Sequence, residues 1–358
     1  MKKGLFIVAL AATVSVLSST AFSQDLSNNP AFKNGTEWLA NPVANPDAEA
    51  TSEAQMKPYE ETLQTNTGEK LTFKMVPIKG GEFTMGSDSG EKDEAPAFKA
   101  TVAPFWMEEH EVTWQEFSLF GLLYLANAHK SGAVKSESDR DEIADALAAP
   151  TAPYSIGTIS YYKSNKEGYP ASGMTRYAAQ MYCKWLTATT GRYYRLPTEI
   201  EWEYAARGKE GNPFPWETTE VKSDKGCFYA NFKPDRGNYT KDGSLITSRC
   251  GIFSANSNGL YDMAGNVAEW TSTVYVESGV ESMSDMNPEL RYNAAKEDPY
   301  RLKRKSVRGG SWKDPESLIR SAWRSYEYQN QPRCYVGFRC VRTMISDTRG
   351  AASKGRKK

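Results

Sequence analysis

The chain has 358 residues, of which 39% are apolar and 25% are charged, and these values are typical of a globular protein with a substantial core. Lys plus Arg and Asp plus Glu each number 44, so the formal net charge is zero. A general nucleic-acid binder needs a basic surplus to neutralise phosphates, and the composition therefore argues against that class.

The first 23 residues have the pattern of a signal peptide. Two lysines precede an apolar run from residue 4 to 17, which is too short to span a bilayer comfortably. Small residues at Ala21 and Ser23 predict cleavage after Ser23, with an uncleaved anchor as the alternative. The mature chain is expected in a bacterial periplasm, where disulfides form. The first cysteine is Cys183, so no lipid anchor is expected.

Composition divides the rest of the chain into segments. Residues 24–69 are polar and rich in Pro, Asn and Ala, which predicts a flexible N-terminal arm. Residues 70–345 carry the periodic patterns of a folded domain, interrupted at 129–168 by a charged, alanine-rich stretch that we interpret as a surface insertion. Residues 346–358 form a basic tail that is expected to be disordered.

The domain begins with strand patterns. Apolar side chains between residues 71 and 76 predict a first strand, and after a turn at Gly80 the alternation at residues 83–85 predicts a second. Thr113 followed by Glu116 has the spacing of a capping box, so a helix is expected to start there.

Two further helices are predicted by their caps. One begins at Thr175, places Tyr177, Met181 and Trp185 on one face, and ends at Gly191. The other has Thr198 as its N-cap with Glu201 three positions later, and Gly208 is expected to end it.

Seven phrases occur along the chain in one order: "GGEFTMGS", "EVTWQEF", "YCKWL", "RLPTEIEWEYAARG", "NGLYDMAGNVAEWT", "RGGSW" and "GFRC". Together they resemble the formylglycine-generating enzyme, or sulfatase-modifying factor, family over roughly residues 70–345. The resemblance implies a single α+β domain with a C-type lectin-like fold that is rich in loops and poor in regular secondary structure.

Three longer phrases resemble one branch of that family more closely, the GldK/PorK proteins of gliding motility and type IX secretion. They are "NFKPDRGNYTKDGS", "MNPELRYNAAKEDPYRLKRKSVRGGSWKDPESL" and "RSYEYQNQPRCYVGFRC". This implies a non-catalytic scaffold at the inner face of the outer membrane, with periplasmic ring proteins of the GldN/PorN type, copies of itself and outer-membrane components as partners. Those relatives are typically lipoproteins, and this chain lacks the lipid-bearing cysteine.

The stretch "VRGGSWKDPESLIRSAWR" has the frame of an enzyme site. In active members of the family two cysteines follow the glycine turn and bind copper, and the corresponding positions here hold Asp314 and Ile319. A hydrocarbon binds no metal, and a lone carboxylate is a poor ligand for copper(I). No copper is therefore expected, and Ser311 and Arg324 are expected to have structural roles in a degenerate active site.

Two other functions remain open. A cofactor-dependent oxygenase or other enzyme could use Ser311, Asp314 and Arg324 in the same cleft, or pair Ser311 with His110. A lectin-like module could bind peptide or sugar instead. His110 and His129 are the only histidines, so the chain cannot build a three-histidine metal site.

The resemblance also implies two structural calcium sites, built from the oxygen ligands that calcium prefers. The ligands of the first would be the side chains of Asn231 and Asp242 and the carbonyls of Phe232 and Ser244. Those of the second would be the side chains of Asn266 and Glu269 and the backbone oxygen near Val267. The alternative is that these Asn and Asp residues only form turns with their own backbone.

Five cysteines leave at least one unpaired. The resemblance implies a disulfide between Cys183 and Cys340. A second between Cys227 and Cys250, which flank the first calcium loop, is a weaker hypothesis. Cys334 would then be the odd thiol, although a Cys334–Cys340 pair is an alternative.

Overall fold

The computed structural model describes residues 45–64, 70–120, 167–207, 212–235, 240–277, 287, 289–295 and 297–344. The predicted signal peptide, all but the last two residues of the 129–168 insertion, and the basic tail lie outside these ranges. Among the described residues, no helix combines the length and apolarity needed to cross a bilayer.

Most regular elements of the described residues are short. The strands are β1 (Tyr59–Gln64), β2 (Lys70–Ile78), β3 (Gly81–Met85), β4 (Phe98–Val102), β5 (Phe105–Glu108), β6 (Tyr194–Arg195), β7 (Ala268–Val274), β8 (Arg304–Arg308), β9 (Ser325–Tyr328), β10 (Val336–Gly337) and β11 (Val341–Thr343). The helices that lie wholly within the described ranges are α5 (Arg176–Thr190) and α6 (Glu199–Ala206), with 3-10 turns η1 (Pro46–Ala48), η2 (Glu53–Gln55), η3 (Tyr300–Lys303) and η4 (Glu316–Leu318).

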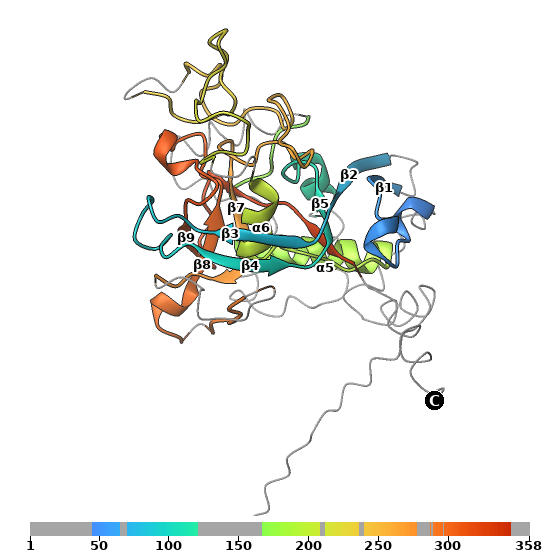
Figure 1. Ribbon diagram of the computed structural model, residues 1–358. Helices are drawn as coiled ribbons and strands as arrows, with labels where there is room; N and C mark the ends of the chain where they lie inside the picture. The colour runs from blue at the N-terminus through green and yellow to red at the C-terminus, as the bar shows by residue number, and fades with distance from the viewer. Residues whose placement is uncertain are drawn as a thin grey trace, which may run out of the picture.

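The strands form three small sheets (Figure 1). One has the order β1-β2-β5-β11-β6, one has the order β10-β7-β8-β9, and β3 pairs with β4 alone. The strands predicted at 71–76 and 83–85 are both present, as β2 and β3, but they belong to different sheets. The predicted α+β, loop-rich architecture is confirmed.

The folded part begins earlier than predicted. β1 lies inside the segment expected to be a flexible arm, and it pairs antiparallel with β2 from Tyr59 opposite Met75 to Gln64 opposite Lys70. One inward position of β1 is Glu61, which is fully buried and accepts hydrogen bonds from Arg192 and Tyr194. A glutamate on the buried face makes the composition of this strand polar, so the segment was predicted to be flexible.

Helix α5 has the predicted caps, but not the predicted face. The Thr175 hydroxyl accepts from Ala178 N at 3.3 Å, and Gly191 ends the helix with φ 73°. Met181 and Trp185 are buried, whereas Tyr177 is 48% exposed. Positions four apart drift by about 40° around a helix of 3.6 residues per turn, so Tyr177 lies about 80° from Trp185 and falls beyond the edge of the buried face.

Helix α6 carries the predicted capping box. Thr198 Oγ1 accepts from Glu201 N at 3.2 Å, while Glu201 Oε2 accepts from Thr198 N at 2.9 Å. The helix ends at Ala206, and the expected stop at Gly208 lies outside the described residues. The capping box at Thr113 is also present, and residues 114–120 are helical.

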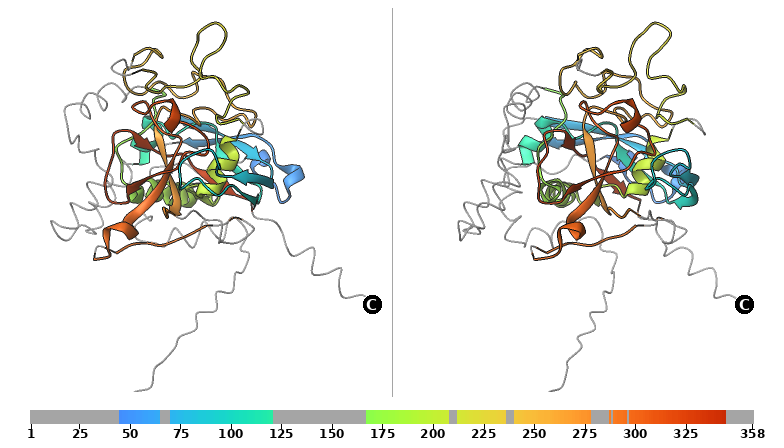
Figure 2. Two further views of the ribbon diagram at one scale, coloured as in Figure 1. Left: turned by 60° about the vertical axis from the view of Figure 1, so that its left-hand side comes forward. Right: turned by 90° about the vertical axis from the view of Figure 1, so that its left-hand side faces the viewer.

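The long loops gather on one side of the sheets. In all three views the yellow and gold segments, residues 212–235 and 240–265, lie on the side of the sheets opposite α5 (Figures 1 and 2). These loops carry the first predicted calcium site. The turn after β8 that corresponds to the enzyme site packs against them, because Asp314 O accepts from Lys233 N at 2.9 Å.

Candidate functional site

A tight glycine turn follows β8. Gly309 and Gly310 have φ values of 91° and 64°, which only glycine adopts readily. A Cβ on Gly310 would lie 2.3 Å from the carbonyl oxygen of Leu318 and 2.9 Å from Cγ2 of Ile319. The turn therefore packs directly against the segment that holds one of the two positions where the active family has copper-binding cysteines.

Ser311 and Asp314 close this turn on themselves. Ser311 is fully buried and its hydroxyl donates to Asp314 Oδ2 at 2.7 Å. Lys313 Nζ lies 2.6 Å from Asp314 Oδ1. Both carboxylate oxygens of Asp314 are thus engaged by neighbours in the same turn.

Ile319 has an apolar environment. It is 0% exposed and belongs to a small cluster with Phe214, Ala230, Phe232 and Ala264. Its side chain fills a gap between the glycine turn and the loops, which is a packing role.

Arg324 is fixed by a buried ion pair. Its Nε and Nη2 donate to the two oxygens of Glu199 at 2.8 and 3.0 Å, and its Nη1 donates to the carbonyl of Asp93 at 2.7 Å. Burial alone would raise the pKa of Glu199, but Arg324 and then Arg308 lower it to about 2.

Arg308 extends this pair into a network. It lies 3.5 Å from Glu199 and donates to Glu203, which also accepts from Arg207. We call the five side chains Glu199, Glu203, Arg207, Arg308 and Arg324 the arginine-rich network. With three guanidinium groups and two carboxylates, it gives the buried Arg324 a structural partner for its charge.

The residues of the first predicted calcium site are brought together. Asp242 Oδ2 accepts from Phe232 N at 2.8 Å and Oδ1 accepts from Ser244 N at 3.1 Å. Asn231 is 1% exposed, and its Oδ1 is a buried oxygen with no hydrogen-bond partner among the described residues. The unpartnered amide oxygen of Asn231 is compatible with an oxygen-seeking ion such as calcium, whereas the bond from Ser244 N to Asp242 is the local turn of the alternative interpretation.

The second predicted calcium set does not fit. Both oxygens of Glu269 accept hydrogen bonds from Arg339, at 2.7 to 2.9 Å, and Oε2 also accepts from the indole of Trp202 at 2.8 Å. Asn266 Oδ1 accepts from Ser248 N at 2.9 Å and from Asn231 Nδ2 at 3.2 Å. A cation at Glu269 would face a guanidinium in direct contact, so these residues have a hydrogen-bonding role.

The sequence did not predict a third group of candidate metal ligands, which lies next to Asn266 of the second calcium set. One carboxylate oxygen each of Glu111 and Asp262 and the Cys250 sulfur all lie within 4.8 Å of one another. Glu111 is joined to the predicted residues through Asn266 Nδ2, which donates to its Oε1 at 3.0 Å. Glu111 and Cys250 are 139 positions apart, and no spacing motif links them.

We call Glu111, Asp262, Glu269, Arg339 and Cys250 the acidic network. Burial and then the Asp262 carboxylate raise the pKa of Glu111 well above its ordinary value. Burial also raises the pKa of Asp262, although Gly251 N–H and Arg339 oppose this. Three carboxyl groups share one guanidinium here, so ionisation of all three would leave unbalanced negative charge.

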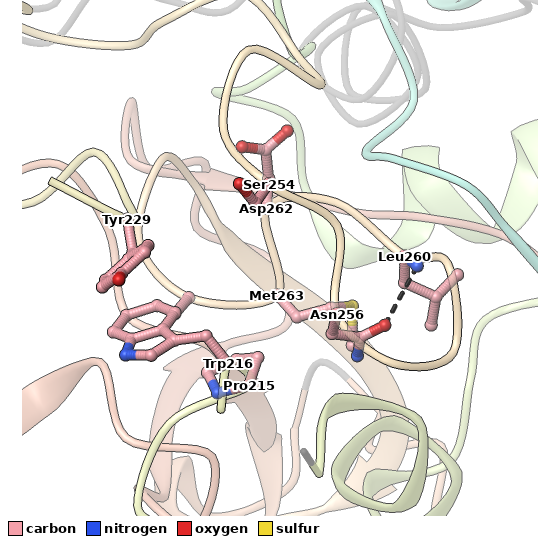
Figure 3. A pocket seen from close by; sticks show the side chains of 9 residues that line it. Pro215, Trp216, Tyr229, Ser254, Asn256, Leu260, Asp262 and Met263 are labelled. Atoms are coloured by element: carbon pink, nitrogen blue, oxygen red, sulfur yellow. Dashed lines mark hydrogen bonds between the residues drawn. The ribbon is translucent and has the colours of Figure 1, made fainter. Parts of the chain in front are cut away.

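A shallow surface pocket with an interior of only about 10 Å³ borders this network at Asp262. Its lining residues are Pro215, Trp216, Tyr229, Ser254, Asn256, Leu260, Asp262, Met263 and Ala264. Figure 3 shows Trp216 and Tyr229 on one side, with the Asp262 carboxylate pointing away from them. Trp216 already stacks on Phe214 and Tyr229, with ring centroids 4.8 and 5.3 Å apart, which argues against an open platform for sugar stacking.

Histidine chemistry receives no support. His110 Nδ1 is 2.8 Å from the carbonyl oxygen of Glu111, and the hydroxyl of Ser311 is bonded to Asp314. The alternative pairing of Ser311 with His110 is therefore not formed. His129 lies outside the described residues.

The cysteines separate into two cases. The sulfurs of Cys183 and Cys340 are buried 3.4 Å apart as free thiols, so the implied disulfide stays a prediction with its partners side by side. Cys227 is exposed, whereas Cys250 lies 3.7 Å from the carbonyl oxygen of Glu111, and both are free. The structure gives no support to a Cys227–Cys250 bond, and Cys334 is a half-buried free thiol.

Comparison with known proteins agrees with these features. The family model "Sulfatase-modifying factor enzyme 1-like domain" matches residues 60–344, a range that includes most of β1. Formylglycine-generating enzyme of Mus musculus is 33% identical over 297 residues, covering 75% of this chain and 74% of that protein. Inactive C-alpha-formylglycine-generating enzyme 2 of Bos taurus is 31% identical over 231 residues, covering 58% and 73%.

A solved structure shows the same fold. PvdO from Pseudomonas aeruginosa superposes with a TM-score of 0.56 at 25% identity, over 75% of this chain and 94% of PvdO. The ordered motifs, the small sheets and the glycine turn after β8 thus have a common explanation. The chain belongs to the sulfatase-modifying factor enzyme 1-like family, with the fold of the formylglycine-generating enzymes.

Proposed function

We propose that this chain is a catalytically silent member of its family that works as a periplasmic scaffold in a type IX secretion or gliding-motility assembly. The observation that carries the proposal is the surroundings of positions 314 and 319. Copper(I) is held by soft thiolates, and these positions offer a carboxylate bonded to Ser311 and Lys313 and a hydrocarbon packed in an apolar cluster.

The same fold exists in a relative named as inactive. That bovine protein is 31% identical to this chain, so the family's framework is retained in a member described as having no formylglycine-generating activity. This supports a non-catalytic role here, because packing and hydrogen bonds are enough to stabilise the turn that follows β8.

An enzyme built on Ser311, Asp314 and Arg324 is the weaker alternative. Arg324 makes a bidentate pair with Glu199 and also donates to backbone carbonyls, so its charge is committed. Ser311 is buried and donates its hydroxyl proton to the adjacent carboxylate. Neither group is presented to a substrate in this arrangement.

The partners and location in the proposal rest on the resemblance to GldK/PorK proteins. They are periplasmic ring proteins of the GldN/PorN type, further copies of this chain and outer-membrane components at the inner face of the outer membrane. Calcium belongs to the proposal as a structural ion at Asn231 and Asp242, with the carbonyls of Phe232 and Ser244. No role in nucleic-acid binding is proposed, because the net charge is zero.

Catalytic silence is tested by copper loading. The wild-type protein, the Asp314→Cys/Ile319→Cys double variant and an Asp314→Ser/Ile319→Ser control would each be titrated with copper(I) under anaerobic conditions. We expect the double-cysteine variant to bind one more equivalent of thiolate-bound copper than the other two proteins, since it alone has soft ligands at this turn and the remaining thiols are common to all three. Stoichiometric copper in the wild type, together with oxygen consumed in step with modification of a cysteine-containing peptide when air is then admitted, would overturn the proposal.

The scaffold role needs a separate measurement. Native envelope fractions would be cross-linked, and the adducts of this chain identified by mass spectrometry. Adducts with periplasmic ring proteins or with further copies of the chain are expected. Recovery of the monomer alone would contradict assembly while leaving the copper result untouched.

A further inference from the structure

The acidic network contains a thiol and two carboxyl groups that neither calcium prediction uses. Glu111 stands just beyond β5, Cys250 in the loop after the first calcium site, and Asp262 before β7. One ligand atom from each lies within 4.8 Å of the other two. Glu111 and the loop of residues 250–262, which are distant in sequence, thus present ligand-type atoms to one small volume.

An unpartnered oxygen points to a missing ligand. Glu111 is 0% exposed; its Oε1 accepts from Asn266, whereas its Oε2 has no hydrogen-bond partner among the described residues. Buried polar oxygens are almost always bonded, and an exception calls for an explanation such as an ion. This observation is independent of the proximity of the three residues.

The charge around the site also favours a cation. Glu111 and Asp262 approach each other while the one neighbouring guanidinium, Arg339, is already bonded to Glu269. Asp262 holds its carboxylate in place by accepting from Gly251 N at 2.6 Å, and its backbone has a φ of 56° that few residues other than glycine adopt. A divalent ion between the two carboxylates would offset their repulsion.

We propose that Glu111, Cys250 and Asp262 bind a thiophilic divalent cation of the zinc class. A thiolate with two carboxylates suits zinc, whereas calcium takes oxygen ligands only. Ligand atoms around tetrahedral zinc lie roughly 3.5 Å apart, so side-chain movements of about 1 Å would close the present group around an ion. A fourth position is left for water.

The position of the site suggests what the ion does. It joins the end of β5 to the loops on both sides of Gly251, which have few strand or helix hydrogen bonds of their own. Asp262 also lines the shallow surface pocket and is 8% exposed, so the group lies close to the surface. The cation would therefore stabilise the loop of residues 250–262. This role is separate from that of the calcium proposed in the loop of Asn231 and Asp242.

Cobalt(II) tests the proposal with a direct signature. The full mature chain, reduced and freed of metal by chelator, would be titrated with cobalt(II) and then with zinc. We expect one cobalt per chain with thiolate-to-cobalt charge-transfer absorption that zinc abolishes. The band should vanish in Cys250→Ser but persist in Cys227→Ser, because the second thiol is exposed and outside the network.

A further variant separates ligation from folding. Glu111→Gln keeps an oxygen to accept from Asn266 and should fold, as checked by circular dichroism, yet bind cobalt roughly tenfold or more weakly. The proposal is overturned by the absence of the band, by its persistence in Cys250→Ser, or by equal displacement with calcium. Peptide mapping of the native protein that finds Cys250 in a disulfide would overturn it as well.

Discussion

Two buried charge networks meet at Trp202 of helix α6, and they differ in how their carboxyl groups are neutralised. The arginine-rich network has three guanidinium groups for the carboxylates of Glu199 and Glu203, and every pair is in direct contact or close to it. The acidic network has three carboxyl groups for the single guanidinium of Arg339, and leaves an oxygen of Glu111 unpartnered.

The pKa directions follow from this difference. Burial raises the pKa of a carboxyl group unless a partner compensates. Arginine partners outweigh burial for Glu199 and bring its pKa to about 2, whereas burial and a like charge raise the pKa of Glu111. In the arginine-rich network every carboxylate is neutralised by arginine. In the acidic network the carboxyl groups outnumber the guanidinium groups, so a bound cation could offset their negative charge.

The largest expected effect comes from breaking the balanced network. Arg324→Met leaves Glu199 as a buried charge with one less partner, and removing one partner of a buried ion pair lowers the free energy of unfolding by about 3–5 kcal/mol. Urea denaturation at neutral pH measures the change.

The matched control for this variant is Lys99→Met. Lys99 pairs with Glu82 on the surface, with 71% and 58% of the two side chains exposed. Exposed pairs contribute about 0–1 kcal/mol, so the control should unfold nearly as the wild type does. A similar loss of unfolding free energy in both variants would contradict the larger contribution expected of the buried arginine-rich network.

Lowering the pH should weaken the arginine-rich network and reduce the free energy of unfolding. The pKa of Glu199 is about 2 in the folded chain, below its ordinary value of 4.5. Its stabilisation is therefore complete above pH 4.5 and is lost as the pH falls toward 2, a contribution of about 3 kcal/mol for a shift of this size. Glu199→Gln should flatten this part of the stability curve, and an unchanged acid limb would exclude Glu199 as its source.

Trp202 connects the two networks and gives a smaller effect. Its indole N–H donates to Glu269 at 2.8 Å, and its ring lies 5.6 Å from the Arg308 guanidinium. Trp202→Phe removes a hydrogen bond to a charged acceptor, which contributes about 1.5–3 kcal/mol. Trp216→Phe is the control, since its N–H donates to the carbonyl of Glu220 in an exposed loop. Equal thermal shifts in the two variants would contradict the link.

Local patterns predicted the parts of this fold that depend on neighbours in sequence. The capping boxes at Thr113 and Thr198 and the stop at Gly191 each involve residues within a few positions, and all three are present. The family could be predicted as well, because each of its motifs is a short continuous stretch of sequence. β1 was missed because its buried Glu61 is satisfied by Arg192, 131 positions away.

The candidate site shows the same limit. Asp314 and Ile319 could be placed by counting along one turn, and the structure adds what they touch. The role of Glu269 was misassigned because its partner Arg339 lies 70 residues further on, and Cys250 was assigned to a disulfide although its nearest acidic neighbours come from other segments. Pairings of this range are set by the folded topology, which local spacing does not encode.

The smallest expected effect is the sharpest test of the contrast between the networks. In metal-free protein at neutral pH, Asp262→Asn keeps an oxygen that can accept from Gly251 N, and asparagine tolerates the left-handed backbone at this position. The change removes one of two like charges that face each other, so the free energy of unfolding should stay within about 1 kcal/mol of the wild type or rise. Denaturation with chelator present measures it. A loss as large as that of Arg324→Met would mean that Arg339 already balances Asp262, and the acidic network would then have no charge left for a cation to offset.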